Sequence, residues 1–174
     1  FCLRNNGELE WADQSYASAA SLAIRDKDRV RVITARQGQA KVEWSRGNLP
    51  AADTAMEALA TEAEQLDAKR VLAMVLHDRS GVARDRGDLP RAIRLGYDAF
   101  TRTADEFERE RVLADLANYL SVYGAMESAA DALRALEITA RSADLRWLTQ
   151  INLLSLAVRT TNEVMFQHYR RTLS

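Results

Sequence analysis

The chain has 174 residues, of which 47% are hydrophobic and 28% are charged, so it can bury the core of a folded domain and is not a disordered chain. Its 24 basic and 25 acidic side chains leave a net charge of −1, which argues against non-specific binding to nucleic acid or an anionic membrane. The single cysteine, Cys2, excludes an intramolecular disulfide framework, and no apolar run is long enough to span a membrane.

Two kinds of marker recur along the chain. Segments of the form Gly-x-apolar-x-x-small begin at Gly7, Gly47, Gly87 and Gly124, and a degenerate fifth copy begins at Asn162. Glycine, and after it asparagine, most easily adopts a left-handed backbone, so we expect a turn at each. About midway between these turns stand Asp28, Asp67, Asp105 and Asp144. An aspartate there can cap the start of a helix.

The segments between successive markers predict about nine helices. In chain order they lie within residues 7–28, 28–47, 47–67, 67–87, 87–105, 105–124, 124–144, 144–162 and 162–174. Alanine is abundant and the chain has only two prolines, Pro50 and Pro90, both in the first turn of a helix, where proline is tolerated. The sequence therefore predicts an all-α fold of repeated helix pairs.

The apolar pattern predicts which helix faces are buried. Small or apolar residues recur 5, 9, 12 and 16 positions after each turn glycine, and steps of four and three trace one stripe on a helix. These stripes are Ala12, Tyr16, Ala19, Ala23; Ala52, Met56, Leu59, Ala63; Ala92, Gly96, Ala99, Thr103; and Ala129, Leu133, Leu136, Ala140. The residue seven before a turn is always small, which lets two helices approach closely. These residues are Ala40, Ser80, Ala117 and Ser155.

The glycine segments, the small residue before each turn and the apolar stripe resemble the tetratricopeptide repeat family, from Gly7 to about Ser174. The resemblance implies a right-handed superhelical α-solenoid of antiparallel helix pairs, with residues 1–174 as a single solenoid. The repeats are longer than the usual ~34 residues and lack the family's aromatic residue four positions before the turn. In this they are similar to the sensor solenoids of LuxR-type and peptide-sensing bacterial regulators. We therefore expect a cytoplasmic slice of a longer bacterial signalling or transcription-regulatory protein; an unrelated helical bundle or solenoid is the alternative.

The resemblance also implies a binding surface. In the family, residues 3, 6, 10 and 13 positions before a turn line the concave side; before Asn162 these are Thr149, Asn152, Leu156 and Arg159. The candidate partner-binding residues carried over from all the repeats are Gln37, Lys41, Trp44, His77, Arg84, Arg111, Asn118, Asn152 and Arg159. The lining positions hold cations and amides and no acid, which predicts a groove for a protein or peptide, especially an acidic or C-terminal segment.

Several alternatives stay open. The cations can instead pair with nearby acids such as Glu43 and Asp85, and Trp44 can pack against the neighbouring hairpin rather than anchor a partner. The groove can also hold a small anionic effector. The strongly apolar residues 147–158 are followed by only one short helix, so a homodimer through the C-terminal edge is a further hypothesis. Trp11 and Trp147 are expected to pack inside the fold.

No motif in the sequence indicates chemistry. His77, Asp78 and Ser80 superficially resemble a catalytic triad, but Ser80 is the small residue expected between two helices. His77 and His168 stand in different repeats without metal-ligand spacing, and no glycine-rich phosphate loop is present. We expect no enzyme activity, no cofactor, no metal and no direct contact with nucleic acid or membrane.

Overall fold

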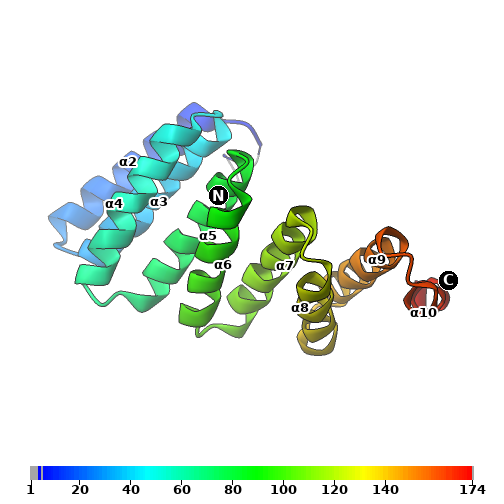
Figure 1. Cartoon of the computed structure of the whole chain (residues 1–174). Coiled ribbons are helices and arrows are strands. Elements are labelled where there is room, and N and C mark those ends of the chain that lie inside the picture. The colour runs from blue at the N-terminus through cyan, green and yellow to red at the C-terminus, as the bar shows by residue number, and fades with distance from the viewer. Residues whose placement is uncertain (1–3, 5, 174) are drawn as a thin grey trace. The chain divides into compact units, whose positions relative to one another are not determined.

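A computed structural model of the chain describes residue 4 and residues 6–173, so Cys2 lies outside the described residues. The described residues form the nine helices labelled α2 to α10 and no strand (Figure 1). Their bounds are α2 Leu9–Arg25, α3 Arg29–Ser45, α4 Leu49–Gln65, α5 Lys69–Asp85, α6 Leu89–Arg102, α7 Glu106–Tyr123, α8 Met126–Thr139, α9 Ala143–Arg159 and α10 Glu163–Leu173. The all-α prediction and the helix order are confirmed.

The helices group into two compact units, residues 1–103 and residues 104–174. In unit 1, each of the helices α2 to α5 packs against the next in the chain, and α3 also packs against α5. In unit 2, α7 packs on α8, α8 on α9, and α9 on α10. We call α3, α5, α7 and α9 the A helices, because each of them precedes a turn of the repeated type.

The turn glycines adopt the expected conformation. Gly7, Gly47, Gly87 and Gly124 have φ between 80° and 97°, the left-handed region in which other residues are strained. After α3, the amide of Gly47 donates to the carbonyl of Trp44 and that of Asn48 to the carbonyl of Glu43, both at 2.9 Å. This pattern satisfies carbonyl groups that the helix end leaves without a partner.

The prediction that the four recurring aspartates cap helix starts is correct at two of the four positions. Asp28 and Asp105 each accept a hydrogen bond from a backbone amide at a helix start, so they cap α3 and α7. Asp67 was predicted to cap α5 but instead has a φ of 50°, because it occupies the left-handed position that glycine takes in the turns at Gly7, Gly47, Gly87 and Gly124. Asp144 lies within the first turn of α9, whose cap is Ser142.

The fifth turn is shifted by one residue from its expected position. Thr161 is the left-handed residue there, with a φ of 51°. Asn162 accepts a bond from the amide of Met165 at 3.0 Å and so caps α10. A shift of one residue rotates a helical position by about 100°, so the shift changes which side chains of α9 face outward.

The core follows the predicted stripe. In unit 1, Ala52, Met56 and Ala63 have no exposed surface, and in unit 2 Ala129 and Leu136 are at most 1% exposed. The stripe is wrong at Ala19, which is exposed while its neighbour Ala20 is buried, because the inward face of α2 is turned by one residue there.

The expectation that Trp11 and Trp147 pack inside is also wrong, since they are 65% and 58% exposed. Ser155 was expected to be the small residue between helices, but it is exposed. With the turn at Thr161, neither Ser155 nor Trp147 lies on the inward side of α9.

Helix α10 is attached to α8 by a buried tyrosine. The Tyr169 hydroxyl donates to a carboxylate oxygen of Glu137 at 2.8 Å, and Tyr169 is only 5% exposed. Burial, with the bond to Glu137, raises the pKa of Tyr169 to about 12, so the hydroxyl keeps its proton under ordinary conditions. The contact fixes α10 on α8, the second helix before it in the chain.

Candidate functional site

The candidate residues of unit 1 lie on neighbouring A helices, α3 and α5. Gln37 and Lys41 extend from α3 to a single carboxylate of α5, that of Asp78, at 2.6 and 2.7 Å. Gln37 is buried, and the Lys41 side chain is 24% exposed. Asp78 is not one of the predicted lining positions, but it follows one of them, His77, and its carboxylate pairs with Lys41.

Trp44 is part of the same connection between α3 and α5. Its ring covers Gly81, where a Cβ would overlap the ring, and its indole Nε1 donates to Asp85 at 2.7 Å. Arg84 donates to the other oxygen of Asp85 at 2.8 Å. Trp44 therefore packs against the neighbouring hairpin, one of the two alternatives that the sequence left open, and Asp85 is the acid that pairs with Arg84.

Glu43, the other acid considered, forms local contacts instead. It accepts hydrogen bonds from Arg46 at 2.7 Å and from Asn48 at 2.9 Å, on the turn that follows α3. The bond from Arg46, followed by that from Asn48, lowers the pKa of the Glu43 carboxyl below its ordinary value. Glu43 therefore stays charged without neutralising the candidate cations.

Unit 1 also contains an ion cluster that the repeat pattern does not predict. Asp53 on α4 is 7% exposed and accepts from Arg79 at 2.9 Å, from Arg86 at 2.6 Å and from Arg91 at 2.7 and 3.1 Å. Arg79 also pairs with Glu57. Burial alone would raise the pKa of Asp53, but the bonds and charges of Arg79 and Arg91 outweigh it, so the pKa lies below the ordinary value.

This cluster joins α4 to α5, to the turn after α5 and to the start of α6. No repeat pattern indicates it, because its partners are 26 to 38 residues apart in the sequence. An aspartate directly after the buried Ala52 is the one local signal, since a charge beside a buried stripe requires a partner.

The A helices of unit 2 run side by side. Near their N-terminal ends, the backbone amide of Arg141, just before α9, donates to Glu110 of α7 at 3.2 Å. At their last turns, Arg159 donates to the hydroxyl of Ser121 at 2.6 Å and to its carbonyl at 3.1 Å. Contacts at both ends place α7 and α9 next to each other in the same direction.

The shift of the fifth turn changes the outward residues of α9. Counting from Thr161, the lining positions hold Leu148, Ile151, Ser155 and Val158. Counting from Asn162 gave Thr149 and Leu156 as lining residues, but these are only 1% and 2% exposed. The inward positions, in contrast, agree across the A helices when Thr161 is aligned with the turn glycines: Val75, Val112 and Thr149 are equivalent and all are buried.

The outward surface of α9 is therefore largely apolar. Leu148 is 49% exposed and Val158 and Trp147 are each 58% exposed, while Ile151 is half-buried. On α7, Phe107 lies one turn before Arg111 and is 57% exposed. Exposed apolar side chains in such a concentration mark an interaction surface.

The other candidate residues of unit 2 are accessible. Arg111, Asn118, Asn152 and Arg159 are all exposed. Arg111 pairs with Glu108 on its own helix at 3.0 Å. Arg159 contacts Ser121 and has no ion-pair partner within residues 6–173. In unit 1, His77 is half-buried on α5. The assignment of these residues to partner binding stays a prediction.

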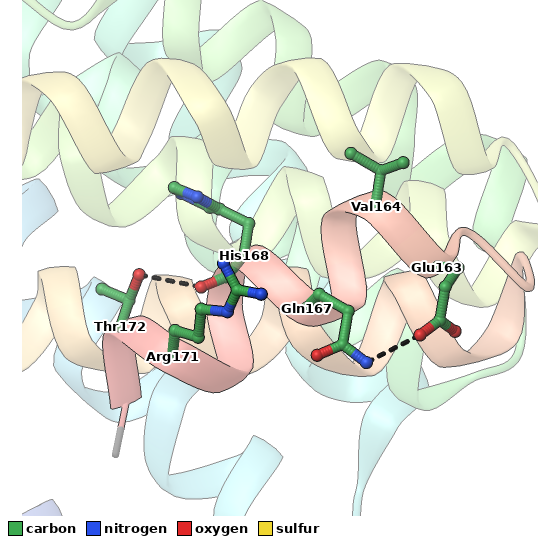
Figure 2. Close-up of a pocket in the computed structure, with 6 residues that line it drawn as sticks. All are labelled: Glu163, Val164, Gln167, His168, Arg171 and Thr172. Atoms are coloured by element: carbon green, nitrogen blue, oxygen red, sulfur yellow. Dashed lines mark hydrogen bonds between the residues drawn. The ribbon is translucent and has the colours of Figure 1, made fainter.

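Two hollows lie on other surfaces of unit 2. One of about 570 Å³ follows the outer side of α10, where Figure 2 shows Gln167 bonded to Glu163, with His168, Arg171, Thr172 and Val164 beside them. Five of these six side chains are polar. The other, of about 530 Å³, is lined by residues of α8, α9 and α10, among them Met126, Arg134, Leu156 and Met165.

The three residues that superficially resemble a catalytic triad make contacts that stabilise the fold. Ser80 is buried and its hydroxyl donates to the carbonyl of His77 at 2.6 Å, while Asp78 holds Gln37 and Lys41. Among the described residues, no three of His, Cys, Asp and Glu gather as a metal site would require. None of the described helices combines the length and the apolar character needed to cross a membrane.

Comparison with solved structures identifies the fold. Nearly identical TPR-like repeats assigned to a kinesin light chain of Podosopora anserina superpose with a TM-score of 0.78 at 12% identity, over 98% of this chain and 88% of that one. A substituted variant of those repeats gives the same TM-score at 13% identity, over 98% and 87%. BtubC (BKLC) from P. vanneervenii gives 0.77 at 16% identity, over 94% and 71%.

No family model matches the sequence, and no curated protein matches it. The chain nevertheless has the TPR-like solenoid fold, as the resemblance predicted.

Proposed function

We propose that the chain is a protein-interaction module that performs no chemistry and binds a segment of a partner protein on its A-helix faces. The observation that carries this proposal is that Gln37, Lys41 and Trp44 of α3 are hydrogen-bonded to carboxylates of α5. Side chains that are already immobilised lose little entropy when a partner binds, so such a face is preorganised for recognition. Repeat solenoids use extended surfaces of this kind.

The preference for an acidic or C-terminal segment rests on different groups in the two units. In unit 1, a partner carboxylate must compete with Asp78 for Lys41 and with Asp85 for Arg84. In unit 2, Arg159 has hydrogen bonds only to Ser121 among the described residues, and its remaining N–H groups can donate to a partner. We propose that the acidic end of a partner segment binds at unit 2.

The cellular role that we propose is the sensor or docking region of a bacterial signalling or transcription-regulatory protein, in the cytoplasm. The TPR-like fold and the long repeats support it. The alternative is that the same basic side chains bind a small anionic effector. The two functions can be told apart by which ligand, a peptide or a small anion, stabilises the chain.

A peptide array with acidic C-terminal segments tests the proposal. The double variant Arg84→Glu with Arg111→Glu is expected to weaken binding of the selected peptides at least about tenfold, because like charges then face the partner. The matched control is Arg102→Glu with Arg134→Glu on α6 and α8. These arginines have similar exposure, 42% and 51% against 37% and 53%, and similar local ion pairs, so binding should be unchanged.

Equal binding by both double variants would exclude the A-helix faces of the two units as binding sites. Thermal-shift measurements distinguish partner binding from effector binding. They compare phosphate, citrate and glutamate with the peptides, and stabilisation by these anions but not by the peptides favours a small anionic effector.

A further inference from the structure

One outward stripe of α9 is apolar in its middle and oppositely charged at its ends. Asp144, Leu148, Ile151, Ser155 and Arg159 follow one another in steps of four, three, four and four, so they lie on one side of the helix. We call them the α9 stripe; Trp147 and Val158 lie along its edge. At a rise of 1.5 Å per residue, the charged ends are about 22 Å apart.

The charges at both ends are available for a partner. Asp144 is exposed and has no hydrogen-bond or ion-pair partner among the described residues. Arg159 is also exposed; its two bonds to Ser121 fix the guanidinium group without neutralising it. Leu148 and Val158 between them are 49% and 58% exposed, so apolar surface remains uncovered by α8 and α10.

We propose that the α9 stripe binds the α9 stripe of a second copy of this chain, with the two helices antiparallel around a twofold axis between Ile151 and Asn152. In that register Asp144 of each copy faces Arg159 of the other. A twofold interface requires a self-complementary surface, and a helix with an acid at its start, a base at its end and apolar residues between them meets this requirement.

The side-chain sizes along the stripe agree with the same register. Leu148, the largest exposed aliphatic residue of the stripe, lies opposite Ser155 of the second copy, so a large side chain meets a small one at both symmetric positions. Antiparallel helices also place opposite ends of their dipoles together. The arrangement excludes water from Leu148 and Ile151 and pairs both charged ends.

The dimer goes beyond the proposed partner binding and uses some of the same residues. Asn152 and Arg159 lie in the interface, so the second copy and a partner segment exclude each other at unit 2. The candidate residues of unit 1, such as Lys41 and Trp44, do not take part. The dimer is tested with the chain alone and partner binding is tested with peptides. If the chain does not dimerise, the proposed function is therefore unaffected.

Sedimentation velocity of the chain from about 5 to about 200 µM tests the dimer, since its population depends on protomer concentration. The expected result is a shift from 19.5 kDa towards twice that mass. Asp144→Arg or Arg159→Asp alone sets like charges against each other at both ends and should weaken the dimer at least about tenfold. The double variant with both substitutions restores opposite charges and should return the dissociation constant to within about threefold of the original.

Matched aliphatic variants locate the interface on α9. Leu148→Asp should give a monomer, whereas Val164→Asp, on α10 at 84% exposure, should leave the dimer intact. Circular dichroism and thermal melting show whether each variant is folded. If one of the single charge variants does not fold, the double variant still tests the proposed pairing. A chain that stays monomeric at all concentrations overturns the proposal, and so does a dimer that is insensitive to Arg159→Asp and Leu148→Asp.

Discussion

Asp53 illustrates how a single buried charge can tie several elements together. Three arginines from α5, from the turn after it and from α6 donate to its two oxygens, and both Asp53 and Arg79 are less than 10% exposed. Charges removed from water are tolerated when they are paired and hydrogen-bonded, and removing one partner leaves the others buried without compensation.

We expect Asp53→Ala to lower the free energy of unfolding by about 3–5 kcal/mol, because Arg79 is then a buried cation that has lost its main partner. Urea denaturation measures the change. Asp98→Ala is the control, since Asp98 forms a half-exposed pair with Arg102 at 3.8 Å and should cost less than about 1 kcal/mol. A loss for Asp53→Ala no larger than that of the control would show that the cluster contributes little.

The low pKa of Asp53 predicts an acid-dependent loss of stability. The pKa is lower in the folded chain than the ordinary value of about 3.9, so the ionised carboxylate favours folding at all pH values above that number. This contribution is lost as pH falls from about 4 through the folded pKa. Urea midpoints at neutral pH and at several pH values below 4 should decline more steeply for the native chain than for Asp53→Asn. Parallel declines would contradict the assignment.

At the scale of the elements, the turns show which features a sequence pattern can locate. Each A helix ends in a left-handed residue, and glycine fills that position in three of the four cases, after α3, α5 and α7. In the fourth, Thr161 adopts the same conformation at a φ of 51°, which is unfavourable for a β-branched residue. The turn is thus set by the fold, and glycine is the residue that forms it at the lowest cost.

Exchanging the residues at these turns should change stability in opposite directions. Gly47→Ala is expected to cost about 1 kcal/mol, because alanine is strained at a φ of 80°. Thr161→Gly should stabilise the chain by up to about 1 kcal/mol, since relief of strain exceeds the added freedom of the unfolded chain. Thermal or urea denaturation of both variants tests the pair. Destabilisation by Thr161→Gly would mean that the hydroxyl or methyl group of Thr161 is important there.

At the scale of the whole molecule, the two units present different A-helix faces. In unit 1 the face is polar and its cations are already paired through Asp78 and Asp85. In unit 2 the face combines Phe107, Leu148 and Val158 with the unneutralised Arg159. Unit 1 is suited to a polar partner segment, which it can bind without rearranging its side chains. Unit 2 is suited to a partner that covers apolar surface.

The proposed partner and the proposed second copy compete for Arg159. The peptide array with Arg84 and Arg111 reversed reports on the partner, and sedimentation of the chain alone reports on the dimer. If both proposals hold, peptides that bind at unit 2 favour the monomer by mass action, which would couple recognition to the assembly state.

The order of the residues was enough to predict the helices, their order, four turns and most of the buried stripe. Helical periodicity and left-handed glycines are local properties, so they can be read without knowing which helices become neighbours. The packing of the helices in three dimensions determined which partners the charged groups meet: Asp78 meets Lys41, Asp85 meets Trp44, and Asp53 meets its arginines. These groups are 26 to 41 residues apart and meet because neighbouring helices pack side by side. It also decided the outward face of α9, because one residue of shift at Thr161 turns a helix by about 100° and exchanges a polar surface for an apolar one.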